Sequence, residues 1–172
     1  MNPLHLSLSR ASHALALMLL GLMAGFFWTY TINLSPALAQ MDGAVYAQVQ
    51  SSLNRHVRHA LFFVAFFGPP VVCALALGLA ASQRHRAWWR VLAGAALVYA
   101  LGIIVFTREV NLPLNYRTEA WNPQALPLDW AQVRSDWNLA NAWRTVCAFG
   151  CFALGLWSWG QRLKCYENNS KL

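Results

Sequence analysis

Charged residues are scarce in this 172-residue chain, and acidic ones most of all, with six Asp and Glu against 13 Lys and Arg. Only 11% of the residues are charged, whereas soluble domains average about 25%, and 58% are hydrophobic. The chain also lacks a C-x-x-C motif, so its four cysteines indicate neither a disulfide framework nor a zinc site. The shortage of charge argues against a soluble domain and predicts a protein whose main solvent is lipid.

Four apolar runs are each long enough to cross a bilayer, which takes about 20 residues. The runs cover residues 13–34, 59–81, 88–107 and 143–160. Basic residues lie at the ends of these runs, where they can anchor to headgroups, and this explains the net charge of +7 without nucleic acid. We therefore predict an all-α fold, a four-helix transmembrane bundle that forms a single integral-membrane domain over residues 1–172.

The short connection SQRHRAWW, between the second and third runs, is dense in arginine, as cytoplasmic loops are. With four spans, both termini lie on the same side as this connection. We therefore expect a multi-pass protein of the cell membrane, plasma or inner, with both termini cytoplasmic. Trp88, Trp89, Trp157 and Trp159 would form an aromatic belt on that side, and Arg162 would anchor the last helix to headgroups.

The letters ALAQ at residues 37–40 resemble a signal-peptide cleavage site. However, the apolar run before them extends over residues 14–34, longer than the 7–15 residues of a signal-peptide core. We expect this segment to be retained as the first helix. Tyr30 and Asn33, at the polar edge of the run, would then lie at the mouth of a site.

The connection over residues 108–142 has three prolines and three tryptophans, and it is too aromatic for a solvated linker. We predict that it folds back as a cap on the outer end of the bundle. At about 100° per residue, a narrow stripe on one helix face collects Trp130, Arg134, Trp137, Asn141 and Arg144. Such a stripe offers flat walls for a ring and donors for an oxygen, although interfacial anchoring by long side chains explains it as well.

Two asparagines, Asn111 and Asn115, flank a Leu-Pro-Leu turn after the third run. Each can either satisfy local backbone groups or face a ligand. The haem alternative is disfavoured because no two histidines fall at matching depth on facing helices.

The entry to the second run places Asn54 and Arg58 on one face, with His56 and His59 about 60° apart around the helix. No carboxylate follows at metal-ligand spacing, so a metal site is not predicted. A proton-transfer role for one imidazole is favoured over metal binding. An interfacial histidine without a role is the simpler alternative.

Several of these segments together resemble the family of small membrane proteins that includes the anthrone oxygenases. They are TYTINLSPAL, DGAVYAQVQSSLNRHV, TREVNLPLN and W-x(6)-W-N-x-x-N-x-x-R, in this order along nearly the whole chain. The resemblance implies a four-helix transmembrane bundle. It also implies oxidation of an anthrone-like substrate, with dioxygen as co-substrate and no bound redox cofactor.

Such chemistry needs a base, donors for an enolate oxygen and flat walls that exclude water. On this interpretation the candidate catalytic residues are His56 and His59 as bases and Arg144 and Asn141 as oxyanion donors. The candidate substrate-binding residues, all near the outer end, are Tyr30, Asn33, Asn54, Arg58, Asn111, Asn115, Trp121 and Trp137.

Two other classes of function stay open. One is a non-catalytic membrane protein that binds a lipophilic ligand or assists a partner complex. The other is a transporter, which is disfavoured because the four runs are almost free of ionisable residues. A closed aromatic cavity reaching His56 and Arg144 would favour catalysis, and a flat exposed groove would favour binding. The expected partners are the bilayer and a lipophilic small molecule, with no nucleic acid and no metal; a homo-oligomer stays open.

Overall fold

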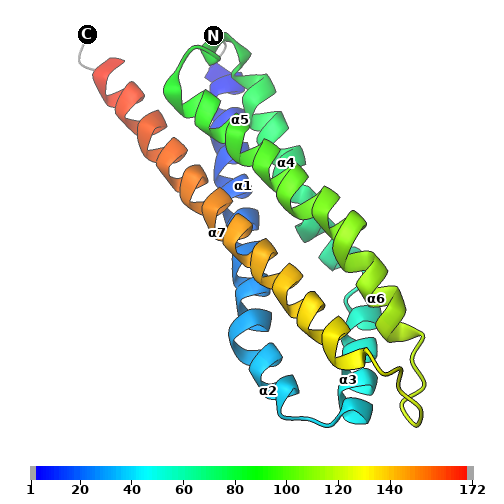
Figure 1. Ribbon diagram of the computed structural model, residues 1–172. Helices are drawn as coiled ribbons and strands as arrows, with labels where there is room; N and C mark the ends of the chain where they lie inside the picture. The colour runs from blue at the N-terminus through cyan, green and yellow to red at the C-terminus, as the bar shows by residue number, and fades with distance from the viewer. Residues whose placement is uncertain (1–2, 170–172) are drawn as a thin grey trace.

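Four long helical rods run up and down and place both ends of the chain at the same end of the molecule (Figure 1). The computed structural model describes residues 3–169. The first rod joins α1 (Pro3–Thr29), a π-helical segment η1 (Tyr30–Leu34) and α2 (Ser35–Ala39). The second rod comprises α3 (Gly43–His56) and α4 (Ala60–Leu79), and a short 3-10 turn η2 (Ala81–Gln83) follows. The third joins α5 (Ala87–Tyr99), η3 (Ala100–Val105), η4 (Thr107–Asn111) and α6 (Leu112–Glu119), and the fourth is α7 (Trp130–Asn169).

The predicted all-α fold with four long apolar helices is confirmed for the described residues. The helices that are long and apolar enough to cross a membrane cover Leu4–Ala39, Ala60–Leu79, Ala87–Glu119 and Trp130–Cys165. Such a protein contacts the lipid bilayer along these helices. The described part of the chain contains only an isolated bridge, Asn122 to Ala125, in place of any strand.

The helices run further outward than the apolar runs of the sequence. Most of the connection predicted as a cap, residues 108–142, is helix that extends the third and fourth rods, and only residues 120–129 lie between α6 and α7. At 1.5 Å per residue the 40 residues of α7 are about 60 Å long, twice the hydrocarbon core of a bilayer. Polar residues that suggested a helix end lie inside helices instead, and the fourth rod supplies hydrogen-bond partners to two of them, Thr107 and Asn115.

Each helix of the second rod begins at a side-chain cap. Asp42 accepts a hydrogen bond from the Val45 N–H at the start of α3, with 2.9 Å between the atoms. His59 accepts from the Phe62 N–H at the start of α4 through Nδ1, at 3.3 Å. Both caps satisfy N–H groups that lack a partner in the first turn. They fix where the outer helix α3 and the apolar helix α4 begin.

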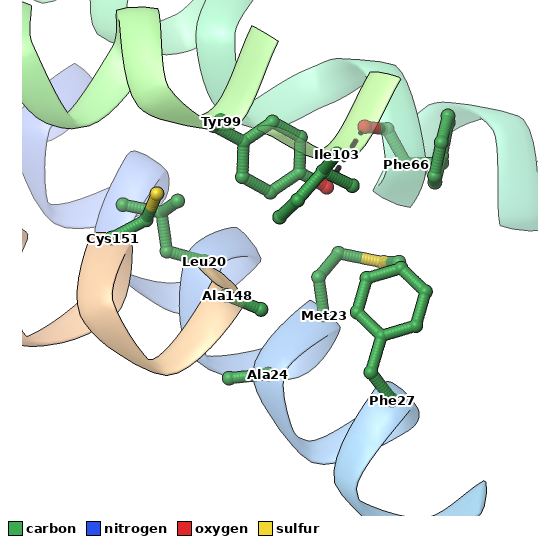
Figure 2. Packing of buried hydrophobic residues seen from close by; sticks show 9 residues of the cluster. All are labelled: Leu20, Met23, Ala24, Phe27, Phe66, Tyr99, Ile103, Ala148 and Cys151. Atoms are coloured by element: carbon green, nitrogen blue, oxygen red, sulfur yellow. Dashed lines mark hydrogen bonds between the residues drawn. The ribbon is translucent and has the colours of Figure 1, made fainter. Parts of the chain in front are cut away.

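An apolar core occupies the middle of the bundle, where α1, α4, α5 and α7 meet (Figure 2). Pro70 has no N–H, so it leaves the carbonyl of Phe66 without its helical donor. The Tyr99 hydroxyl donates to this carbonyl at 3.0 Å, as the dashed line in Figure 2 shows. A neighbouring helix therefore satisfies the backbone that proline frees, as the interior of a membrane protein requires.

The inner end of the bundle differs from the predicted ring of anchors. Trp88 and Arg162 are fully buried, and the guanidinium carbon of Arg162 lies 4.2 Å from the Trp88 ring centroid. Arg162 donates to the carbonyl and the hydroxyl of Ser9, at 3.0 and 2.8 Å. Both side chains point inward because the carbonyl, the hydroxyl and the indole face together solvate the guanidinium. They therefore tie α7 to α1 and α5 and do not serve as headgroup anchors.

Candidate functional site

A cluster of buried polar side chains lies in the outer half of the bundle, just beyond the apolar core. On α7, Trp137, Asn141 and Arg144 fall on one face at spacings of four and three residues, and all three are buried. They belong to the stripe predicted from helical periodicity, whose other two members, Trp130 and Arg134, are only partly buried. Its partners come from α1 with η1, from α3, and from η4 with α6. The cluster therefore joins all four rods.

Arg144 is the centre of this cluster, and its side chain is 8% exposed. Its Nη2 donates to Oδ1 of Asn141 at 2.9 Å, and its Nη1 donates to the Thr107 hydroxyl at 3.4 Å. Its guanidinium carbon lies 4.8 Å from the centroid of the Phe27 ring and 5.5 Å from that of Trp137. In the described part of the chain no carboxylate forms an ion pair with Arg144. The guanidinium is therefore held by neutral groups and aromatic faces alone.

Asn141 connects α7 to the end of α1 and to the π-helical segment η1. Its Nδ2 donates to the Thr31 hydroxyl at 2.8 Å and to the Phe27 carbonyl at 3.3 Å. The Thr31 and Thr145 hydroxyls are also within 2.8 Å of each other. With both amide donors used toward α1, the amide oxygen of Asn141 is oriented to accept from Arg144. The threonine hydroxyls carry no sequence signal beyond their helical spacing from the predicted residues.

A chain of hydrogen bonds runs from Tyr30 through Gln50 to Asn54. The Tyr30 hydroxyl donates to Oε1 of Gln50, and Nε2 of Gln50 donates to Oδ1 of Asn54 at 2.9 Å. The direction of the chain leaves Nδ2 of Asn54 as a buried donor without a partner. The Tyr30 ring lies 4.5 Å from that of Trp137, so this chain reaches the α7 stripe. Gln50 is fully buried, and only its spacing of four residues from Asn54 could have identified it from sequence.

Asn111 is fully buried, and neither atom of its amide has a hydrogen-bond partner. Thr107, which bonds Arg144, precedes it by four residues, and Asn115 follows it by four. Oδ1 of Asn115 accepts from Nε1 of Trp137 at 2.5 Å. Because contacts to α7 lie one turn on either side, Asn111 faces the stretch of α7 between Trp137 and Arg144. Among the described residues this amide is therefore an exception to the rule that buried polar groups are hydrogen-bonded.

An aromatic group lies at the outer edge of the cluster. The Tyr46 ring is 6.4 Å from that of Trp121 and 6.3 Å from that of Trp130. The Arg134 guanidinium carbon lies 4.8 Å from the Trp130 centroid. Burial raises the pKa of the Tyr46 phenol to about 12, against the opposing effect of Arg134, so this phenol stays neutral at physiological pH. Through its contact with the Tyr46 ring, Trp121 belongs to an outer wall of packed aromatic rings.

Four of the predicted site residues lie outside the buried cluster. Asn33 is exposed on η1, and Arg58 forms an ion pair with Glu119 of α6. His56 and His59 are both exposed, and the hydrogen bonds of their rings stay within α3 and the start of α4. Nδ1 of His56 is 2.9 Å from the Ser52 carbonyl. The cluster thus unites Tyr30, Trp137 and Arg144 with all the predicted amides except Asn33, while the two imidazoles stand apart from it.

A groove of about 500 Å³ runs along the exposed side of α1 and η1, from Gly21 to Leu34. It is open and mostly apolar, and Tyr30 is the residue that it shares with the buried cluster. It includes neither His56 nor Arg144 in its lining. Over the described residues, no three His, Cys, Asp or Glu side chains are grouped so that they could hold a metal ion.

Comparison with known proteins shows which family the chain belongs to. The family model described as anthrone oxygenase matches residues 60–154, which is more than half of the sequence. No curated protein and no solved structure matches the chain. The matched stretch contains Asn111, Trp137, Asn141 and Arg144, whereas Tyr30 and Gln50 lie before it. The chain belongs to the anthrone oxygenase family.

Proposed function

We propose that this protein is a membrane oxygenase that oxidises a lipophilic phenolic or polycyclic compound of the anthrone type, without a bound redox cofactor. The net reaction converts a ring methylene and dioxygen into a ring carbonyl and water, so atoms and electrons balance without another reductant. The substrate first loses a proton to become an enolate, which is electron-rich enough to react with dioxygen directly. The protein must therefore stabilise an oxyanion on a flat apolar molecule.

The observation that carries the proposal is the buried guanidinium of Arg144, which has no carboxylate partner among the described residues. Burying an unpaired cation is costly, and intramembrane charges usually mark a functional site. An enolate oxygen would supply the missing anion. Its charge appears only as the proton leaves, so the interaction would be stronger in the transition state than with the neutral substrate.

Four of the other buried polar atoms that lack a partner in the described part of the chain are compatible with the same ligand. Nδ2 of Asn54, both amide atoms of Asn111 and Nε of Arg144 are buried without a partner. Three of these four atoms are donors, which suits a ligand that presents an acceptor oxygen. The rings of Phe27, Tyr30 and Trp137 supply the flat apolar surfaces for the body of the substrate.

For the proton acceptor we propose His56 over His59, on the basis of their tautomers. Nδ1 of His56 lies 2.9 Å from the Ser52 carbonyl and 3.3 Å from the Ser52 hydroxyl. The shorter contact favours the tautomer in which Nδ1 donates to the carbonyl, which leaves the lone pair on Nε2. His59 uses the lone pair of Nδ1 to accept the Phe62 N–H. His56 therefore offers a free ring nitrogen as the acceptor, and its exposure means that the proton would arrive through water.

A second candidate function is binding of a lipophilic ligand without chemistry. The open groove on α1, which reaches neither His56 nor Arg144, favours this alternative. The two functions differ in oxygen use. We expect purified protein in lipid vesicles to consume one dioxygen per molecule of anthrone and to form anthraquinone. Binding of anthrone without oxygen uptake above the protein-free rate would support the binding protein instead.

We further propose that both termini face the cytoplasm and that the outer cluster faces the opposite side. The arginine-rich connection between α4 and α5 lies at the same end as the termini in Figure 1, and such loops are retained on the cytoplasmic side. Phe27, Tyr30 and Thr31 of the first rod contribute to the cluster, which supports retention of this segment. N-terminal sequencing of the purified protein that began at Gln40 would contradict the proposal.

A further inference from the structure

The groove along α1 lies on a surface that faces lipid. It falls within the candidate span Leu4–Ala39, and Leu22 and Phe26, which line it, are 59% and 43% exposed. Its volume of about 500 Å³ is within the range of 300–1,000 Å³ that is usual for small-molecule sites. With this candidate span in a bilayer, the groove would be in contact with the hydrocarbon, where lipophilic compounds dissolve.

We infer that this groove is the binding subsite through which the flat apolar body of the substrate enters from the bilayer, with Tyr30 at its inner end. The inference rests on the proposed function and adds the route and the class of molecule that can use it. The compounds it suits are planar polycyclic phenols or ketones whose leading edge carries no sugar and no charge.

Gly25 leaves the floor of the groove free of any side chain. A Cβ added to Gly25 would have no heavy atom within 4 Å, whereas one at Gly21 would come within 3.1 Å of the Phe152 ring. On one side of this floor the Phe26 ring packs against Phe62 of α4, with 5.3 Å between the ring centroids. A flat molecule lying over Gly25 would therefore have an aromatic edge beside it, a favourable neighbour for a polycyclic ring.

Tyr30 joins the groove to the buried cluster. Its side chain lines the groove, yet it is only 8% exposed. On its other side, its hydroxyl donates to Gln50 and its ring lies 4.5 Å from that of Trp137. Trp137 in turn packs under the guanidinium of Arg144. A molecule that moves along the groove therefore meets, at Tyr30, the first member of the network that ends at the buried cation.

The experiment fills the groove without disturbing the packing. Gly25→Leu places a side chain in open space on the groove floor, and Gly25→Ala is a smaller version of the same change. Gly150→Leu is the matched control, because Gly150 is an exposed glycine of α7 that also has no atom within 4 Å of an added Cβ. Each variant is reconstituted in neutral phospholipid vesicles with anthrone dissolved in the bilayer, and oxygen uptake and Tm are measured.

We expect Gly25→Leu to raise KM for anthrone at least tenfold, with kcat within twofold and Tm unchanged. Gly25→Ala should have a smaller effect, and Gly150→Leu should match the wild type. If Gly25→Leu leaves KM within twofold of the wild type, the entry route is wrong while the oxygenase proposal stands.

A binding measurement separates the two proposals when the wild type shows no oxygen uptake, which would overturn the oxygenase. Binding of anthraquinone, which needs no turnover, is then compared between variants in the same vesicles. Weaker binding by Gly25→Leu than by Gly150→Leu supports the groove as a site for a planar apolar ligand. Equal binding by the two variants overturns it.

Discussion

The guanidinium of Arg144 lies 4.8 Å from the centre of the Phe27 ring, so a cation of α7 rests on an aromatic face of α1. Phe27 is also a member of the apolar core shown in Figure 2. The Phe27 ring therefore belongs both to the apolar core and to the surroundings of the buried guanidinium. A ligand oxygen bound at Arg144 would lie next to the apolar core.

Replacement of Arg144 by lysine tests whether turnover depends on the geometry of the guanidinium or only on its positive charge. Arg144→Lys keeps the positive charge but loses the planar fork that bonds Asn141 and Thr107. We expect kcat for anthrone oxidation to fall on the order of 100-fold or more, as when an oxyanion donor is removed. Arg108→Lys is the control, because that side chain is 81% exposed and pairs only with its neighbour Glu109. Turnover of Arg144→Lys equal to that of the control would remove Arg144 from the mechanism.

Asn111 offers a test in which stability and activity move in opposite directions. Asn111→Leu exchanges a buried amide with no partner for an apolar side chain of similar size. The free energy of unfolding should stay the same or rise by about 1 kcal/mol, because no hydrogen bond is lost. Turnover should nevertheless fall roughly 10- to 100-fold, because a ligand contact disappears.

The control for this variant is Asn115→Leu, which removes the bond to the Trp137 indole. It should lower stability by about 1–2 kcal/mol. Chemical denaturation in detergent and oxygen uptake are the two measurements. A large loss of stability in Asn111→Leu would mean that this amide has a structural role.

The two histidines should respond differently to the same substitution. His56→Gln removes the ring nitrogen that would take the proton, so turnover should fall. His59→Gln should leave turnover unchanged and lower only Tm, because the Nδ1 cap of α4 is weakened. His59→Asn, which can retain a capping oxygen, should recover the loss in Tm. Turnover of His56→Gln equal to that of the wild type would show that another group takes the proton.

The ion pair between Arg58 and Glu119 joins the break after α3 to the end of α6. The two side chains are 30% and 15% exposed, so the pair is partly screened by solvent. We expect Glu119→Gln to lower stability by about 1 kcal/mol and Tm by about 2–4 °C. A double-mutant cycle with Arg58→Gln measures the coupling. The exposed pair Arg117 and Asp129 provides the comparison, and it should contribute less.

Hydropathy and helical periodicity are enough to predict the four rods and the stripe of residues on α7 from the sequence. Trp137, Asn141 and Arg144 share a face by spacing alone, and the structure buries them together. The helix ends could not be predicted in the same way. Polar residues such as Thr107 and Asn111 look like the end of a span, yet they continue as helix because α7 faces them.

The contacts between segments that are distant in the chain could not be predicted from the sequence either. In the sequence Gln50 does not differ from many other polar residues. Only the structure shows that Tyr30, 20 positions earlier, donates a hydrogen bond to it. Arg162 looks like a headgroup anchor by position, but Ser9 and Trp88 bring it inside. Each of these outcomes depends on which rods are neighbours, and a pattern within one helix does not contain that information.

The π-helical segments η1, η3 and η4 have a consequence for how the gene can vary. Each widens the turn by about one residue while the helix continues on both sides. Loss of a single codon in Ala100–Val105 would remove that extra residue, return the turn to α-helix and leave the residues beyond it facing nearly the same way. A one-codon deletion that no π-helical turn absorbs would instead rotate everything beyond it by about 100°. Thr107, Asn111 and Asn115 would turn away from α7 together if such a deletion preceded them. We therefore expect descendants of this gene to tolerate exchanges among apolar residues along the rods, length changes in residues 120–129, and one-codon deletions inside the π-helical segments better than in the regular α-helical stretches.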